Sequence, residues 1–499
     1  MGEYSGIREW RPYSYHDLGG RSLGLAEGFR KRCLKVSDRS FSQGLQCQQI
    51  NSMSVLMSME DSVFVVHSPQ GCVGCASFAN DMYRVGQAHR GLPVIRNARI
   101  IVTNLDEKDI VYGGEKKLRE ALLLANERYK PKLIFLFASC ASGIIGDDID
   151  AVAQSTGAEI EPIVVPIHCE GFKSKVCASG FDAAFISLSK HVLKGARKPR
   201  EGDLVNLFAP TSISHKDQVE IERMLTAIGL RANYLPFYSS LEKIRRIPAA
   251  GGSTAICKVF ADEFMKQLER DYGIPFSHTV MPIGVRNTDK WYRGVAALFG
   301  KKAEAERIIE AEHRRVLPLI EDIRRRLEGK RVFICGGTGR SFAAAALVDD
   351  FGMKLVGLET PTYDDDAQID IEYLNGIHGD FAVDIANMQP FEQVNLVKKL
   401  KPDVFIGVPT WTARLGIPTT HVLDSKRPTM GYDGILYLGN KIADQIENPG
   451  FNEKLAAHAR LPYKASWYGK DPFKFIKTVE TMGAAASAAG AGEAGKCPR

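Results

Sequence analysis

The cysteines are the residues of this sequence whose type and spacing could do chemistry. Four of them follow short runs of β-branched and aromatic residues, a pattern that predicts buried strands. They are Cys72 and Cys75 after Val63 to Val66, Cys140 after Leu133 to Phe137, and Cys169 after Ile163 to Ile167. Another, Cys47, lies about one helix before the first run. Because the carboxyl ends of parallel strands meet at one edge of a sheet, these thiols could converge there.

Several kinds of site would use such thiols. Ten cysteines in a chain without an export signal argue against a disulfide framework. Zinc usually takes two close pairs of ligands, and Cys72 with Cys75 is the one such pair; the same spacing permits a thioredoxin-like redox motif. Single thiols on separate strand ends suit an iron–sulfur cluster best. Taken one at a time, each could equally be a small buried side chain.

Charge and hydropathy exclude some classes of function. The formal charge is +6 over 499 residues, with acidic and basic side chains interleaved, as in EAEHRRVLPLIEDIRRRLEGKR. That pattern indicates a solvated helix face rather than a nucleic-acid surface. The longest apolar stretch, LIFLFASCASGII, is too short for a membrane span, and MGEYSGIREWRPYSY lacks the apolar core of a signal peptide. We therefore expect a cytoplasmic protein that binds neither nucleic acid nor membrane.

Strand, turn and helix patterns alternate along most of the chain. Apolar runs that end in Gly, Ser or Pro turns precede helical patterns in SVFVVHSPQG, KLIFLFASCASG, DLVNLFAPTS and RVFICGGTGR. This alternation predicts an α/β fold with parallel sheets flanked by helices. The sequence contains no P-loop, and the CGGTGR turn lacks the glycine spacing of a dinucleotide fingerprint. No nucleotide site is therefore expected.

We expect three Rossmann-like domains. The charged stretch GARKPREGD and a long charged helix from Ala303 to Leu327 mark the boundaries between them. The residues before the first domain should wrap the surface. The low-complexity end GAAASAAGAGEAGKCPR should be disordered, which leaves Cys497 without a role. The predicted segments are an N-terminal extension (1–39), three domains (40–197, 198–328 and 329–480) and a tail (481–499).

Four motifs together resemble one protein family. HSPQGCVGC, DEKDIVYGGEKKLREAL, SCASGIIGDDIDAV and PIHCEGF occur in the order and at the spacings of the catalytic α subunit of nitrogenase component 1. The similarity runs from about Leu45 to about Leu455. The sequence is therefore identified as a member of the nitrogenase-like reductase superfamily, in which the active-site cluster lies between three domains.

The resemblance implies ligands for two inorganic clusters. In the family, three cysteines of each subunit hold an electron-relay P-cluster of the [8Fe-7S] type, shared with a β-type (K-like) subunit. Cys47, Cys72 and Cys140 match them, which leaves Cys75 without a ligand role. The cysteine that anchors the active-site cluster matches Cys257, in TAICKVFADEFMKQLERDYGIP. We expect it between a strand and a helix start, whose amides would favour a thiolate. A separate ATP-hydrolysing iron protein would supply the electrons.

Other positions depart from the nitrogenase pattern. Met430, in PTMGYDGILYL, stands where the family has its molybdenum-ligating histidine, and GVPTWTARLGIP lacks the lysine that supports homocitrate. A thioether cannot replace an imidazole on a hard metal, so homocitrate-bound molybdenum is not expected. His421 is an alternative imidazole if the loop is rearranged, and otherwise a structural histidine. Arg340, in GGTGR, matches a family loop that embraces the cluster, although a surface arginine is an equal interpretation.

The residues predicted to line the reactive face also differ. Cys177 and Phe181 stand where nitrogenase has glutamine and histidine, whereas Val55 matches its shielding valine. Cys177 could ligate the cluster or form a polarizable wall. A phenyl ring in place of imidazole removes a proton donor and makes the pocket more apolar. Within the superfamily this pattern most resembles methylthio-alkane reductase, which cleaves small thioethers to methanethiol and a hydrocarbon.

The prediction is therefore the catalytic α-type (D) subunit of a methylthio-alkane reductase, an enzyme of sulfur metabolism that works as a heterotetramer with β-type chains. Two other functions from the same superfamily stay open. One is a scaffold for cofactor assembly, because α-like scaffolds also keep the anchoring cysteine and lose the histidine. The other is a nitrogenase proper. An ordinary α/β binding protein with incidental thiols would hold no iron.

Overall fold

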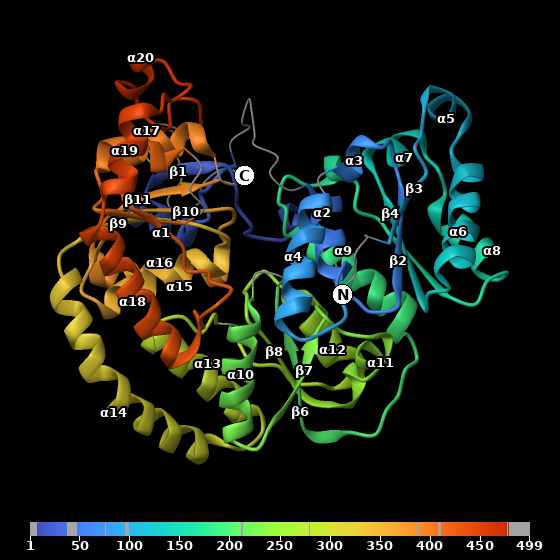
Figure 1. The fold of residues 1–499 in the computed structure, drawn as a ribbon, viewed down its shortest axis with the longest axis horizontal. Coiled ribbons are helices and arrows are strands. Elements are labelled where there is room, and N and C mark those ends of the chain that lie inside the picture. Colours follow the sequence, from blue (N-terminus) through green and yellow to red (C-terminus); the bar gives the residue numbers. More distant parts are fainter. Residues whose placement is uncertain are drawn as a thin grey trace, which may run out of the picture. The chain divides into compact units, whose positions relative to one another are not determined.

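The computed structural model describes most of the chain. It covers residues 7–36, 47–74, 76–94, 99–210, 213–278, 280–386, 389–407, 411–476 and 478. Cys75, Cys497 and the predicted tail lie outside the described residues. The fold is α/β, with parallel sheets and many helices, as the sequence predicted (Figure 1).

Two compact units make up the chain, and each is described by itself. The first comprises Met1–Arg8, Gln46–Thr279 and Gly294–Lys301. The second comprises Glu9–Leu45, Val280–Arg293 and Lys302–Arg499. Two sheets lie in the first unit and one in the second. Each sheet takes its strands from one of the three predicted segments, apart from one strand that the N-terminal segment adds.

A four-stranded parallel sheet in the order β3-β2-β4-β5 positions the predicted relay cysteines. Its strands are β2 (Ser62–His67), β3 (Ile100–Val102), β4 (Leu133–Ala138) and β5 (Ile163–Ile167). Every residue of β2 and β4 is buried. Helices cover both faces, which explains the continuous apolar runs: α6 (Glu115–Tyr129) and α8 (Ile149–Gly157) lie along one face and α9 (Ser179–Leu188) on the other (Figure 1).

A three-stranded parallel sheet completes the first unit. Its order is β7-β6-β8, with β6 (Glu201–Phe208), β7 (Arg231–Leu235) and β8 (Ala250–Ala255). Glycines in β8 permit close packing, because a β carbon on Gly251 would lie 2.8 Å from the Gly202 carbonyl oxygen. Strand β8 leads directly into the turn that contains Cys257.

The other helices of the first unit precede, connect or follow these strands. They are α2 (Gln48–Leu56), α3 (Gly71–Gly74), α4 (Ala76–His89), α5 (Glu107–Tyr112), α7 (Cys140–Ile145), α10 (His215–Ala227), α11 (Leu241–Arg245) and α12 (Asp262–Tyr272). A further helix, α13 (Val285–Leu298), contributes residues to both units. Over the described ranges, no helix combines the length and the apolar character needed to cross a membrane.

A six-stranded sheet forms the core of the second unit, in the order β1-β11-β10-β9-β12-β13. Its strands are β1 (Leu18–Arg21), β9 (Arg331–Cys335), β10 (Lys354–Thr360), β11 (Ala382–Ile385), β12 (Val404–Gly407) and β13 (Thr419–Thr420). The helices of this unit are α1 (Ser22–Arg30), α14 (Lys302–Leu327), α15 (Thr338–Asp350), α16 (Asp365–His378), α17 (Pro390–Leu400), α18 (Gly431–Glu447), α19 (Gly450–His458) and α20 (Ala465–Tyr468). The long charged helix expected before the third segment is confirmed as α14.

The N-terminal segment does more than wrap the surface. Strand β1 pairs antiparallel with β11, whereas the other neighbours in this sheet are parallel. Leu18, Leu25 and Phe29 are at most 3% exposed. The expectation of a purely superficial segment is therefore wrong, because its apolar side chains complete the core of the second unit.

Three buried titratable side chains stand side by side on the sheet of the second unit. Cys335 on β9 is the register partner of Glu359 on β10, which in turn is the partner of Asp384 on β11. The Glu359 carboxyl accepts the Gln389 N–H at 2.9 Å and the Gln393 amide at 2.7 Å. Burial and then the charge of Asp384 raise the pKa of Glu359 to about 8. The folded protein therefore holds a proton on Glu359 at neutral pH.

Stability is expected to fall with rising pH because of Glu359. Its pKa is raised above the ordinary value of 4.5, so the stability that the bound proton confers is full at acidic pH and is lost as the pH rises to about 8. From about pH 6 to about pH 9, the unfolding free energy of the unmodified protein should fall by on the order of 2 kcal/mol more than that of Glu359→Gln. Urea unfolding of both proteins measures this difference. Equal pH dependence in the two proteins would contradict the prediction.

Candidate functional site

Cys47 and Cys140 lie together in the first unit. Cys47 is the N-cap residue of α2, and Cys140 is the first residue of α7, just beyond β4. Both thiols border Gly171. A β carbon on Gly171 would lie 3.4 Å from Cys140 Sγ and 3.6 Å from Cys47 Sγ. The structure therefore brings together two of the three predicted relay ligands.

The donors around Gly171 fit a soft inorganic cluster. Cys47 and Cys140 are free thiols, and thiolates are the habitual ligands of iron–sulfur clusters. Glycine at position 171 brings no side chain against the two sulfur atoms. In the part of the chain that the structure describes, no three His, Cys, Asp or Glu side chains gather closely enough to hold a single metal ion. The two adjacent thiols therefore fit an iron–sulfur cluster.

The segment that carries Cys72 is tied to the segment that carries Cys140. Cys72 follows β2 in the short helix α3 and is partly exposed. The Ser139 hydroxyl donates to the His67 carbonyl at 2.7 Å and so joins the ends of β2 and β4. The same hydroxyl caps α7 by accepting the Ser142 N–H at 3.3 Å. Both cysteine-bearing segments therefore leave the sheet from one hydrogen-bonded edge.

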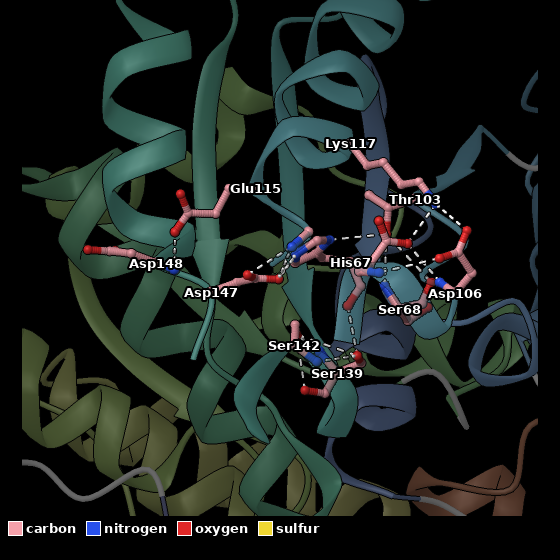
Figure 2. A network of polar contacts seen from close by, with 12 residues as sticks. His67, Ser68, Thr103, Asp106, Glu115, Lys117, Ser139, Ser142, Asp147 and Asp148 are labelled. Atoms are coloured by element: carbon pink, nitrogen blue, oxygen red, sulfur yellow. Dashed lines mark hydrogen bonds and ion pairs between the residues drawn. The ribbon is translucent and has the colours of Figure 1, made fainter. Parts of the chain in front are cut away.

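A buried polar network surrounds His67 (Figure 2). Its Nε2 lies 2.7 Å from Asp147 Oδ2, and its Nδ1 lies 3.0 Å from Thr103 Oγ1. Asp147 also accepts the Gly114 N–H at 3.0 Å, and Thr103 Oγ1 accepts the Ser68 N–H at 3.1 Å. Burial lowers the pKa of His67, although the Asp147 carboxylate opposes this effect. The ring is therefore neutral, and the network assigns the donating N–H to Nε2 and the accepting role to Nδ1.

Replacing Asp147 by alanine should destabilise the first unit. The change leaves two buried donors, the His67 ring and the Gly114 N–H, without their acceptor, at about 1–3 kcal/mol each. We expect the unfolding free energy to fall by about 2–5 kcal/mol. Urea unfolding measures this loss.

The matched control for this substitution is Asp150→Ala. Asp150 also binds a histidine, His168, at 2.7 Å, but both side chains are nearly half exposed. An exposed pair of this kind contributes less than about 1 kcal/mol. If the two variants lost equal amounts of unfolding free energy, the prediction that burial makes the Asp147 contacts more stabilising would be contradicted.

Helix α2 packs closely on the start of α9. The Asn51 side-chain amide donates to the Cys177 carbonyl at 2.9 Å, and the Ser52 hydroxyl donates to the Gly180 carbonyl at 2.8 Å. A β carbon on Gly180 would lie 2.4 Å from the Gln48 carbonyl oxygen. Glycine is therefore required at this crossing, and it holds the segment of Cys177 against the helix that begins beside Cys47.

Two of the predicted pocket residues lie along this helix crossing. Val55, on α2, is fully buried. Cys177 precedes α9, and burial raises the pKa of its thiol, while the Asn51 side chain and the charge of Arg8 act in the opposite direction. Unless a metal binds it, Cys177 is therefore a neutral thiol at physiological pH.

Cys257 lies in a turn between β8 and α12. Its carbonyl accepts the Phe260 N–H at 3.0 Å, and α12 begins only at Asp262. Ala261 has a left-handed backbone, with φ of +65°, which separates the turn from the helix. The expectation that a helix starts at Cys257 is therefore wrong. The strand end was placed correctly, but the helix starts one turn later.

Apolar side chains surround Cys257. Val176 and Val259 are buried together, and both Phe181 and Cys257 pack against them. Phe181 also meets the ring of Phe260 edge to face, with the centroids 5.0 Å apart. The structure thus places predicted residues from two distant segments, Phe181 and Cys257, in one apolar cluster.

Three predicted residues belong to the second unit. Arg340 is half-buried and donates to the Val422 carbonyl at 2.7 Å, next to His421. Burial and nearby cations lower the pKa of His421, which keeps its ring neutral. Met430 is fully buried and precedes α18 as its N-cap residue. Cys257 belongs to the first unit, so a common site for these residues and Cys257 stays a prediction.

Residues 47–447 match the sequence pattern of the family described as nitrogenase component 1 type oxidoreductase. The chain belongs to this family. Membership confirms the resemblance at the level of the family. It implies iron–sulfur clusters, a second subunit and an ATP-dependent iron protein as partners.

Similar members of the nitrogenase component 1 family include proteins of two kinds. The nitrogenase iron-molybdenum cofactor biosynthesis protein NifE of Methanococcus maripaludis is 28% identical over 79% of this chain and 82% of its own length. The nitrogenase molybdenum-iron protein alpha chain of Methanothermobacter marburgensis is 27% identical over 79% and 85%. The solved structure of nitrogenase Cp1 at pH 5 shares the fold, with a TM-score of 0.68 and 22% identity over 86% of this chain and 93% of that one.

Proposed function

We propose that this chain is the catalytic α-type subunit of a methylthio-alkane reductase. A β-type (K-like) subunit would share a P-cluster-type [8Fe-7S] relay cluster with it, held on this side by Cys47, Cys72 and Cys140. An ATP-dependent iron protein would supply low-potential electrons. A small methylthio-alkane would take up two electrons and two protons, so that one carbon–sulfur bond breaks and one C–H and one S–H bond form. The products are methanethiol and a hydrocarbon.

The apolar surroundings of Cys257 carry this proposal. Phe181 stands where nitrogenase has a histidine, and it packs with Val176, Val259 and Phe260 rather than offering a proton donor. An apolar wall gains free energy when it covers a methyl or methylene group and excludes water. A thioether presents such groups, whereas the reduction of dinitrogen calls for proton donors beside the cluster.

Each predicted pocket residue has a role in this reaction. Cys257 would hold the active-site iron–sulfur cluster, and that cluster, of a carbide-containing type, would supply electrons to the bound substrate. Val55 and Phe181 would shape the apolar face and limit the size of the alkyl group. Cys177 would add a soft ligand or a polarizable wall beside the sulfur of the substrate.

The family resemblance assigns two residues of the second unit to the active-site cluster. Met430 offers a thioether in place of a metal-ligating imidazole, which supports an active-site cluster without homocitrate-bound molybdenum. Arg340 would place a positive charge toward a polyanionic cluster. Its hydrogen bond to the Val422 carbonyl holds the neighbouring loop in place.

A scaffold for cofactor assembly is the second candidate function. The NifE relative is named as a cofactor biosynthesis protein, and its 28% identity is close to the 27% of the alpha-chain relative. A scaffold would receive a cluster and pass it on without turnover. Sequence similarity alone therefore gives nearly equal support to a scaffold and to a nitrogenase-type alpha chain. The thioether substrate is supported by the apolar surroundings of Cys257 and not by these relatives.

Anaerobic purification of the chain with its β-type partner tests the proposal. Iron and molybdenum are measured first, and thioether reduction is then assayed with the iron protein and ATP. Ethane or ethene together with methanethiol from a methylthio substrate supports the reductase. An iron-loaded complex that transfers its cluster without turnover supports the scaffold. A colourless complex without iron contradicts both.

A further inference from the structure

Arg8 is buried in the first unit although it comes from the far N-terminal part of the chain. The residue is only 4% exposed. Its Nε lies 3.0 Å from one oxygen of Asp182, which is fully buried, and its Nη2 lies 2.6 Å from an oxygen of Asp262. The same Nη2 donates to the Val259 carbonyl at 2.7 Å. One guanidinium therefore binds three groups that lie at least 174 residues away in the sequence.

The groups that Arg8 binds flank the predicted pocket residues. Asp182 follows Phe181 directly on α9, and the Val259 carbonyl lies in the turn that begins at Cys257. Asp262 is the first residue of α12, after that turn. Arg8 thus connects the Phe181 segment to the Cys257 segment through its side chain.

The backbone of Arg8 adds a further contact to the loop that carries Cys177. Its N–H donates to the Ser179 hydroxyl at 3.0 Å. The Ser174 hydroxyl donates to the same oxygen at 2.9 Å and accepts the Val176 N–H at 3.1 Å. The loop between these serines is therefore fixed at both ends, and the N-terminal segment holds one end.

Geometry favours arginine for this task. A planar guanidinium can bind two carboxylates and a carbonyl at once, because its donors point in fixed directions. Removing one partner from a buried ion pair leaves the other charges uncompensated. Asp182, with no exposed side-chain surface, would lose this ion pair without Arg8.

We propose that Arg8 is a positioning residue that clamps the segment of Cys177 and Phe181 to the turn of Cys257, so that these side chains face one pocket. This proposal rests on the proposed function only for the identity of the cluster and the substrate in the pocket. The clamp itself is a property of the folded chain and is testable without any cluster.

Thiol alkylation measures the clamp directly. The full-length chain is freed of iron with a chelator and treated with iodoacetamide, and the rate at each cysteine is followed by mass spectrometry. For Arg8→Gln we expect the rates at Cys177 and Cys257 to rise about 5- to 30-fold, the effect of one or two kcal/mol lost from local closure. Arg8→Lys keeps the positive charge but loses the planar guanidinium with its several donors, so the alkylation rates should rise less. This variant tests the proposal if Arg8→Gln does not fold.

The control variant is Arg119→Gln. Arg119 also forms a two-pronged ion pair, with Glu159 at 2.8 Å through both nitrogens, but both side chains are about half exposed. In Arg119→Gln the alkylation rates at Cys177 and Cys257 should equal those of the unmodified chain. Unchanged rates at Cys177 and Cys257 in both Arg8 variants would overturn the proposal. An equal rise at Cys72 and Cys140 would also overturn it, because Arg8 would then support the whole unit.

A second experiment distinguishes a failure of the Arg8 proposal from a failure of the proposed function. In the anaerobic complex with the β-type partner, Arg8→Lys should weaken the active-site cluster's electron paramagnetic resonance signal while the relay-cluster signal persists. If the unmodified complex holds no iron, the proposed function fails, and the alkylation rates still decide whether Arg8 is a clamp. Faster alkylation of Cys177 and Cys257 together with an unchanged active-site signal would overturn the role of the clamp in the pocket.

Discussion

Replacing Cys257 by alanine is expected to lower thioether reduction at least about a hundredfold, to background, while the relay-cluster signal persists. The change removes the sulfur that would anchor the active-site cluster. Cys257 packs against Val176 and Val259, whereas Cys47 and Cys140 border Gly171. Alanine fits the Cys257 position without a new clash, so the fold should survive. Turnover and electron paramagnetic resonance of the same preparation measure the two effects.

The matched control for Cys257→Ala is Cys335→Ala. Cys335 is also a free thiol, buried in the sheet of the second unit, where the Gln393 amide donates to its sulfur at 3.2 Å. Its removal should leave both cluster signals and turnover in place. Loss of both signals in Cys257→Ala, or full turnover without the thiol, would refute the proposed division of labour between the two cluster sites.

Replacing Cys140 by alanine is expected to remove the relay-cluster signal and to reduce turnover driven by the iron protein to background. Cys140 Sγ and Cys47 Sγ both border the position that a β carbon on Gly171 would take, so the cluster would lose one of two adjacent ligands. The helix that begins at Cys140 should still form, because Ser139 supplies its cap. Iron content and electron paramagnetic resonance measure the loss.

Cys169→Ala is the control for the relay site. Cys169 is fully buried, and its thiol donates to the Ala138 carbonyl at 3.3 Å. Burial raises the pKa of this thiol well above its ordinary range, which disfavours the thiolate that a cluster needs. The variant should keep the relay signal. A relay signal that survives in Cys140→Ala but disappears in Cys169→Ala would mean that the two assignments must be exchanged.

The strands that position the site were predictable where apolar runs were continuous. Strands β2, β4 and β5 are covered on both faces, so their sequences read as uninterrupted β-branched and aromatic residues. Strand β1, with the sequence LGGR, was missed, and strand β8, with AGGSTA, was expected only through the family resemblance, as the strand that ends before Cys257. Small residues and glycines allow close packing there but give no apolar pattern.

The candidate site was predictable in its cysteines but not in the groups that hold them. Spacing and resemblance identified Cys47, Cys140 and Cys257, and the turn before α12 was missed because only the left-handed backbone of Ala261 interrupts a helical pattern. Arg8 and its partner Asp182 are 174 residues apart, and no local pattern connects them. Such long-range ion pairs arise from tertiary packing, which a single sequence does not display.

The supporting network around His67 had a weak signal in the sequence. His67 ends an apolar run, and a polar side chain at that point of a parallel strand lies at the sheet edge where sites form. Its partners Thr103 and Asp147 come from two other segments. The histidine could therefore have been singled out from the sequence, whereas its acceptor could not.

The tight crossing of α2 and α9 at Gly180 has a consequence for electron tunnelling. From Cys47 to Val55 the helix rises about 12 Å, at 1.5 Å per residue. Because a β carbon at Gly180 would lie 2.4 Å from the Gln48 carbonyl oxygen, the backbones of the two helices are in close contact there. If Cys47 holds the relay cluster and Val55 borders the active-site cluster, as proposed, this helix would set the distance over which electrons tunnel between them.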